Sequence, residues 1–303
     1  WEVEYAFNPT DPDDAAVDTD GDGMTNLAEY WHGQTDPRNP QSYSNTNIIL
    51  DVCVGGDVDK LKDIQIAILA AINGDTVIVA PGTYHEKLDF NGKNIVLQGS
   101  EPEDWTMVAA TIIDADGSGP VVTFAGSEGA SCQLTGLTIT GGYLDSAADG
   151  AGIYGNGCAA KISTCIIHDN QTTAGSGGGI AGCSGMIENC LIYDNTAVNG
   201  GGLNNCLSVK NCTIAYNSAT TQGNQVRYST GAEGDIENSI IWDDNSTGQL
   251  TGTCDITYSC WPGGTSVTGN ISQNPRFVYS ASDDYHLLSY SPCIDAGNPS
   301  DVY

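Results

Sequence analysis

Short runs of alternating apolar and polar residues fill most of the chain, and one arrangement of them occurs three times in succession between residues 150 and 217. Each unit runs from a glycine stretch through two cysteines to an asparagine, without a helix-length segment. Alternation over a few β-branched residues predicts strands with one buried face, and a repeat of this length predicts one coil of a solenoid. The second cysteine and the asparagine of the three units are Cys165 and Asn170, Cys190 and Asn195, and Cys212 and Asn217.

Equivalent residues of successive coils are expected to stack on one another. An asparagine that points inward at a bend can bond its amide to the backbone of the next coil, where a sharp corner would otherwise leave groups unpaired. The cysteines allow two interpretations. Disulfides within each coil, such as Cys158 with Cys165, are slightly favoured; the alternative is two ladders of buried thiols, since free cysteine packs as a small hydrophobe.

A helix is expected before the first strand. Apolar residues recur at helical spacing from Leu61 to Ile72, with Asp59 as a candidate N-cap and Gly74 as a stop signal. A helix at this place would cover the open end of the solenoid, which would otherwise be a bare edge that invites aggregation.

The repeated units resemble the right-handed parallel β-helix, and both flanks resemble a large group of secreted bacterial β-helix proteins. Residues 73–84 (NGDTVIVAPGTY) resemble the entry motif of that group, and residues 285–297 (YHLLSYSPCIDAG) resemble the exit motif of choice-of-anchor proteins. The resemblance implies an all-β fold, a right-handed parallel β-helix over residues 48–303. It implies no single reaction, because the fold hosts lyases, hydrolases, adhesins and inert spacers.

Residues 1–40 form a separate module, joined by a polar linker over residues 41–47. Oxygen ligands fall at positions 1, 3, 5, 9 and 12 of a loop that has glycine at position 6 and a backbone carbonyl at position 7, which is the complete EF-hand pattern for Ca²⁺. The module resembles the single-loop calcium modules related to thrombospondin type 3 and dockerin repeats. Dockerins carry two such loops, so a structural clip is favoured over cohesin binding. The expected calcium ligands are Asp18, Asp20, Asp22, the carbonyl of Met24, Asn26 and Glu29.

Charge narrows the choice of partners. The chain has 9 Lys and Arg against 38 Asp and Glu, a formal net charge of −29, so we expect no nucleic-acid partner, and anionic membrane surfaces are poor partners. An anionic polysaccharide is also disfavoured unless calcium bridges it to the protein. No run approaches the ~20 apolar residues of a membrane span. Eleven cysteines fit oxidising surroundings, and we expect a protein that is secreted or displayed at the cell surface and whose targeting segment has been removed.

Candidate catalytic residues are few. Paired basic motifs of β-helix lyases and the Gly-His-Gly and Arg-Ile-Lys segments of polygalacturonase-like hydrolases are absent. Asp169, Asp194 and Asp244 fall at matching coil positions with His168 beside the first, and stacked carboxylates can form an acid/base pair. Their repetition favours turn residues that accept backbone N–H bonds, since a catalytic set is normally asymmetric.

Aromatic residues offer a second interaction surface, because aromatic faces on a rigid sheet suit neutral sugars. The leading hypothesis is therefore a calcium-binding structural or adhesive scaffold without catalysis, which contacts a neutral polysaccharide or stacks head to tail into fibres. The alternative is a polysaccharide lyase or glycoside hydrolase with a groove along Asp169 and Asp194. The aromatic candidates are Tyr154, Tyr193, Tyr216, Trp242, Tyr258 and Trp261.

Overall fold

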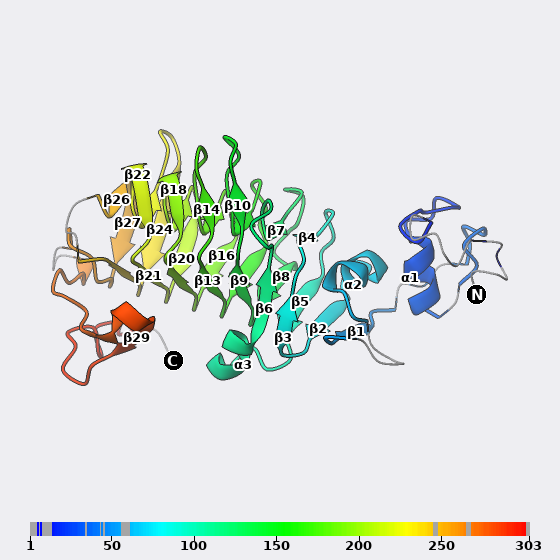
Figure 1. The fold of residues 1–303 in the computed structure, drawn as a ribbon, viewed down its shortest axis with the longest axis horizontal. Coiled ribbons are helices and arrows are strands. Elements are labelled where there is room, and N and C mark those ends of the chain that lie inside the picture. The colour runs from blue at the N-terminus through cyan, green and yellow to red at the C-terminus, as the bar shows by residue number, and fades with distance from the viewer. Residues whose placement is uncertain are drawn as a thin grey trace.

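The protein is a right-handed parallel β-helix of about eight turns, as the sequence predicts (Figure 1). The computed structural model describes residues 5, 7, 14–33, 35–42, 44, 46–55, 61–244, 248–264 and 268–300. Asp59, the candidate N-cap, lies outside these ranges. No helix within the described ranges has the length and hydropathy needed to cross a bilayer.

Each turn of the β-helix contributes strands to parallel sheets that run along its axis. Sheet 1 has nine strands: β1 (Ile49–Val52), β2 (Thr76–Val79), β5 (Val96–Gly99), β8 (Gln133–Thr135), β12 (Lys161–Ser163), β16 (Met186–Glu188), β20 (Ser208–Lys210), β24 (Glu233–Glu237) and β27 (Thr253–Thr257). Sheet 2 has seven: β3 (Gly82–Tyr84), β6 (Thr111–Asp114), β9 (Thr138–Thr140), β13 (Ile166–His168), β17 (Leu191–Tyr193), β21 (Thr213–Ala215) and β25 (Ile240–Trp242).

Two further sheets complete the coils. Sheet 3 contains β4 (Leu88–Asp89), β7 (Val122–Thr123), β11 (Ile153–Tyr154), β15 (Ile180–Ala181), β19 (Leu203–Asn204), β23 (Val226–Arg227) and β26 (Leu250–Thr251). Sheet 4, which projects along one side in Figure 1, contains β10 (Tyr143–Leu144), β14 (Gln171–Thr172), β18 (Thr196–Asn199) and β22 (Ser218–Gln222).

The asparagine at the end of each repeat unit forms a buried ladder, as expected. Asn170, Asn195 and Asn217 are almost fully buried. The side-chain amide of Asn195 donates to the Oδ1 atom of Asn217 at 2.9 Å and to the carbonyl of Ile167 in the preceding coil at 2.9 Å. The amide of Asn170 donates in the same way to Asn195 Oδ1 at 3.0 Å. The ladder thus pairs backbone groups that the sharp corner after sheet 2 would leave unsatisfied.

All eleven cysteines are free in this structure, so the disulfides favoured within each coil are wrong and the thiol ladders are right. Cys158 precedes β12 and Cys165 follows it, so a strand separates the two cysteines of one coil. Neighbouring coils lie only ~4.8 Å apart, and the Sγ atoms of Cys158 and Cys183 approach to 3.6 Å. Burial raises the pKa of Cys165 and Cys190 well above the ordinary thiol value, which keeps both unreactive.

Helix α2 (Ile64–Ala70) covers the first coil and is shorter than the sequence predicts. Both of its ends are fixed by side chains from distant positions. The carboxylate of Glu86 accepts from the backbone N–H groups of Ile64 and Gln65, each at 2.9 Å. The ammonium of Lys93 donates to the carbonyls of Ile68, Leu69 and Ala71 at 2.8 to 2.9 Å. A negative charge at the N-terminus of α2 and a positive charge at its C-terminus complement the helix dipole. Because α2 covers the first coil, it occupies the end of the β-helix that a second copy would need for head-to-tail stacking.

Two elements outside the coils differ from the expectation. Helix α3 (Trp105–Ala110) lies between β5 and β6, where the sequence analysis expected only coil strands. Residues 277–287 were expected to continue the coils, but they form an antiparallel hairpin of β28 (Phe277–Tyr279), a 3₁₀ turn (Ser280–Ser282) and β29 (Asp284–Leu287). Both α3 and this hairpin lie on the same side of the β-helix (Figure 1).

Candidate functional site

The acidic loop before α1 (Asn26–Trp31) has the backbone arrangement of a calcium loop. Both carboxylate oxygens of Asp18 accept backbone N–H groups, from Gly21 at 2.7 Å and from Gly23 at 3.0 Å. Asp20 and Asp22 each use one oxygen in the same way, for the N–H groups of Asp22 and Met24. One oxygen from each of the three aspartates lies within 4.8 Å of the others. The loop therefore holds three carboxylates around one point.

Five further oxygens of this loop are buried without a hydrogen-bond partner among the described residues. The side chain of Asn26 is one example: its Nδ2 donates to the carbonyl of Asp14 at 2.7 Å, while its Oδ1 has no hydrogen-bond partner. Glu29 is fully buried, and this burial raises the pKa of its carboxyl to about 7. Unpaired buried oxygens are costly, and oxygens are the ligands that Ca²⁺ requires. The five atoms are Asp20 Oδ2, Asp22 Oδ2, Asn26 Oδ1, Glu29 Oε1 and Glu29 Oε2.

The loop is fastened to the end of the β-helix through α1. Leu27 and Trp31 pack against the main hydrophobic core, and Thr25 Oγ1 donates to the carbonyl of Leu69 in α2 at 3.2 Å. His32 Nε2 lies 2.8 Å from Asp75 Oδ2, and both side chains are fully buried. A cation bound in the loop would therefore stabilise α2 and the first coil as well as the loop itself.

The candidate catalytic residues lie at one corner, after sheet 2. Asp169 and Asp194 both adopt left-handed backbone conformations, with φ of 54° and 50°, and both side chains are exposed. His168 Nδ1 lies 2.8 Å from Asp169 Oδ2, and the His168 ring stacks on Tyr193 at 5.0 Å between centroids. The left-handed turn explains the recurrence of Asp here, because short polar side chains tolerate it.

The C-terminal hairpin covers part of the expected aromatic platform. Tyr285 packs on Tyr193 and Tyr216, with ring centroids 5.0 and 6.0 Å apart, and meets Phe277 edge to face at 5.3 Å. Burial raises the pKa of Tyr193, Tyr216 and Tyr285. The hairpin therefore packs on these rings. Tyr193, Tyr285 and Trp242 are buried, and Tyr216 is half-buried.

The same hairpin makes the acidic corner asymmetric. The turn of the hairpin places Asp283 close enough to Asp194 for its charge to act on that carboxyl. Partial loss of solvent, followed by the negative charges of Asp283 and Asp169, raises the pKa of Asp194. The sequence gives no sign of Asp283, since its approach depends on how the hairpin folds back.

A cleft of about 640 Å³ opens between α3 and the hairpin, above sheet 2. Its floor is formed by outward side chains of the sheet, including Ile166 and Leu191. Trp105 stands at one wall and is 44 % exposed. Glu103 lies beside it, and the opposite wall carries Asp283, Asp284, Tyr285 and His286.

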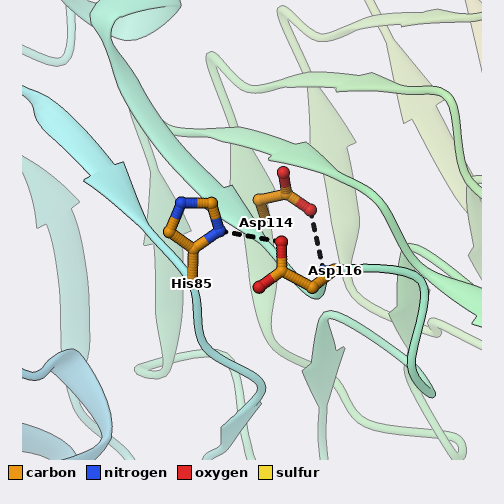
Figure 2. A group of neighbouring side chains, drawn as sticks. All are labelled: His85, Asp114 and Asp116. Atoms are coloured by element: carbon orange, nitrogen blue, oxygen red, sulfur yellow. Dashed lines mark hydrogen bonds and ion pairs between the residues drawn. The ribbon is translucent and has the colours of Figure 1, made fainter.

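His85, Asp114 and Asp116 form a second cluster with ligand-type atoms, at the corner of earlier coils (Figure 2). His85 Nδ1 lies 2.9 Å from Asp116 Oδ1, and Asp114 Oδ1 accepts the backbone N–H of Asp116 at 2.8 Å. His85 and Asp116 are exposed. Its members are paired with one another, and no local pattern of residues predicts the cluster because His85 and the two aspartates lie on neighbouring coils.

No family model matches the sequence, and no curated protein matches it. Among solved structures, pectin methylesterase from Aspergillus niger is 16 % identical, with a TM-score of 0.47 over 75 % of this chain and 84 % of that one. Pectate lyase Pel9A is 14 % identical, with a TM-score of 0.45 over 82 % of this chain and 66 % of that one. Similarities this low transfer no residue role and no activity to this chain.

Proposed function

We propose that the protein is a calcium-binding β-helix, secreted or held at the cell surface, which binds a neutral polysaccharide in the cleft between α3 and the C-terminal hairpin. The observation that carries the calcium part is the set of buried, unpartnered oxygens of Asp20, Asp22, Asn26 and Glu29 in one loop, whose three aspartates Asp18, Asp20 and Asp22 lie within 4.8 Å of one another. Bound calcium would neutralise their charge and hold α1 in place against α2.

Calcium binding is tested by isothermal titration calorimetry on protein stripped with EDTA. We expect a single site, and we expect Glu29→Gln to weaken it at least tenfold, because a neutral amide replaces a ligand carboxylate. Glu233→Gln is the control, since Glu233 is an exposed carboxylate on β24 near the other end of the β-helix. Equal affinity of the wild type and Glu29→Gln would refute this assignment.

The polysaccharide part rests on the shape and charge of the cleft. Trp105 offers an exposed ring for stacking on a sugar, and Asn189 and Asn211 add amides at the floor. Glu103, Asp283 and Asp284 surround the cleft. Carboxylates accept hydrogen bonds from sugar hydroxyls and repel a polyanion, so the cleft fits a neutral chain better than an acidic one.

Affinity gel electrophoresis with a panel of neutral glucans, mannans and xylans, and with polygalacturonate, tests this proposal. We expect retardation by a neutral polymer that Trp105→Ala reduces at least fivefold. Tyr143→Ala is the matched control, because Tyr143 is exposed to a similar extent, 39 % against 44 %, but lies on sheet 4. Preferential binding of polygalacturonate, or an equal effect of both variants, would contradict the proposal.

Hydrolysis of the bound chain is the second candidate function, favoured by the asymmetric group of Asp194, Asp169 and Asp283. A carboxyl with a raised pKa suits a general acid, and a neighbouring carboxylate suits a base or nucleophile. Release of reducing ends should then fall as the pH rises through the raised pKa of Asp194. Asp194→Asn should abolish this release, whereas the control Asp145→Asn, at an exposed carboxylate directly after β10, should not. Unchanged release by Asp194→Asn would remove this candidate.

A further inference from the structure

Two cysteines outside the repeated thiol ladders meet where the C-terminal segment returns to the last coils. Cys260 forms a parallel bridge with Ile240 of β25 and is 3 % exposed. Cys293 lies 33 residues later in the exit motif and is half-buried. Both line a cleft of about 390 Å³. The Sγ atom of Cys260 donates to the carbonyl of Gln273 at 3.2 Å, and each of the two thiols shifts the pKa of the other.

The surrounding contacts hold the Cys293 segment at this place. The Oγ atom of Ser291 donates to the carbonyl of Pro275 and accepts the backbone N–H of Cys293 at 3.1 Å. Asn298 donates from its backbone to Asn238 Oδ1 at 2.8 Å and from its side chain to Glu237 Oε1 at 2.7 Å. The segment is therefore anchored on both sides of Cys293, which holds the Cys293 thiol at the cleft that it shares with Cys260.

The two thiols differ in the way that disulfide formation requires. The interaction with Cys260 lowers the pKa of Cys293, while the same interaction and burial raise the pKa of Cys260. Cys293 is thus the thiol that ionises first, and it is also the more exposed one. Cys158 and Cys183 are also in contact, but both are fully buried, so an oxidant in solution does not reach them in the folded protein.

We propose that Cys260 and Cys293 form a disulfide that fastens the C-terminal hairpin to the last coils. The thiolate of Cys293 attacks a small-molecule disulfide, which gives a mixed disulfide and releases one thiol. Cys260 then loses its proton and attacks the Cys293 sulfur, which forms the protein disulfide and releases the second thiol. The small-molecule disulfide is reduced by two electrons, and the two cysteines are oxidised. The closed loop contains β28 and β29, which carry one wall of the cleft above sheet 2.

Peptide mapping tests the proposal in the intact protein without use of any ligand. Native protein is incubated with oxidised glutathione, blocked with N-ethylmaleimide in urea and digested with trypsin. Cleavage after Arg227 and Arg276 places Cys254 and Cys260 in one peptide and Cys293 in the next. We expect these two peptides to be joined, and chymotryptic cleavage after Tyr258 to leave the cross-link on the Cys260 fragment.

Single-cysteine variants distinguish a disulfide of Cys293 with Cys260 from one with Cys254. Cys260→Ser should abolish the cross-link, whereas Cys254→Ser, which removes another incompletely buried thiol nearby, should retain it. We also expect amide hydrogen exchange over residues 277–287 to slow at least threefold in the oxidised wild type. Recovery of Cys293 only as its glutathione or maleimide adduct, or a cross-link that maps to Cys254, would overturn the proposal. Equal exchange in the oxidised and reduced protein would overturn the role of the bond in fastening the hairpin.

Discussion

Replacement of Asn195 by alanine is the sharpest test of how the coils are held together. The Asn195 side chain donates to the carbonyls of Ile167 and Tyr193 and to Asn217 Oδ1, each at 2.9 Å. It accepts from Asn170 twice, at 3.1 Å from the backbone N–H and at 3.0 Å from the amide. The side chain is fully buried, so water cannot replace these bonds.

The expected loss is smaller than five separate hydrogen bonds, because some partners keep other contacts. The Asn170 amide still donates to the carbonyl of His168, and Asn217 Oδ1 still accepts the backbone N–H of Asn195. The backbone N–H of Asn170 loses its acceptor inside the protein. The unsatisfied N–H of Asn170 costs ~1–3 kcal/mol, and the bonds lost by the carbonyls of Ile167 and Tyr193 cost ~1 kcal/mol each, so we expect a loss of about 3–5 kcal/mol in the free energy of unfolding.

Urea unfolding followed by circular dichroism measures this difference. Asn199→Ala is the control from the same repeat unit, since the Asn199 side chain makes one long contact with Ser176 Oγ, at 3.4 Å, and is only half-buried. We expect the control to lose less than about 1 kcal/mol. A loss below about 1 kcal/mol for Asn195→Ala would show that the ladder does not stabilise the stack, and the reasoning above would be wrong.

Removal of calcium by EDTA should lower the melting temperature by about 5 °C, because calcium at a hundred times its Kd stabilises the folded protein by ~2.7 kcal/mol. Calorimetry with and without CaCl₂ measures the difference, and an unchanged melting temperature contradicts the prediction. Lys93→Met should destabilise the protein by about 2 kcal/mol, because three helix carbonyls lose their charged donor. Burial lowers the pKa of Lys93 from 10.5, its value in the unfolded chain, to about 8. Between these two pH values the unfolded chain binds more protons than the folded protein, so the stability of the wild type relative to this variant should rise with pH. A difference in urea unfolding that stays constant with pH refutes this. Gly177→Ala should cost more than Gly157→Ala in the same assay: both glycines have positive φ, 71° and 83°, but only a Cβ at Gly177 meets a backbone oxygen, that of Ile180 at 2.7 Å.

Periodic features were predictable from the sequence because the physical reason for them is local. The recurrence of Ile, Cys and Asn specifies both the coil and its register, since a slip of one residue would move every apolar side chain to the outer face. The acidic loop before α1 is equally local: its aspartates accept backbone N–H groups two to five residues away. The residue types and their spacing therefore suffice to predict the coils and the arrangement of the loop.

Only the tertiary structure decided how distant segments meet. Glu86 and Lys93 set the two ends of α2 from beyond it in the chain, so the helix is shorter than its apolar pattern predicts. The hairpin that carries Asp283 and Tyr285 folds back over sheet 2, which buries Tyr193 and changes the surroundings of Asp194. The thiols of one coil are held apart by a strand, while those of neighbouring coils touch. Such contacts depend on the spacing between coils and on where the chain turns back, and a local pattern of residues predicts neither of them.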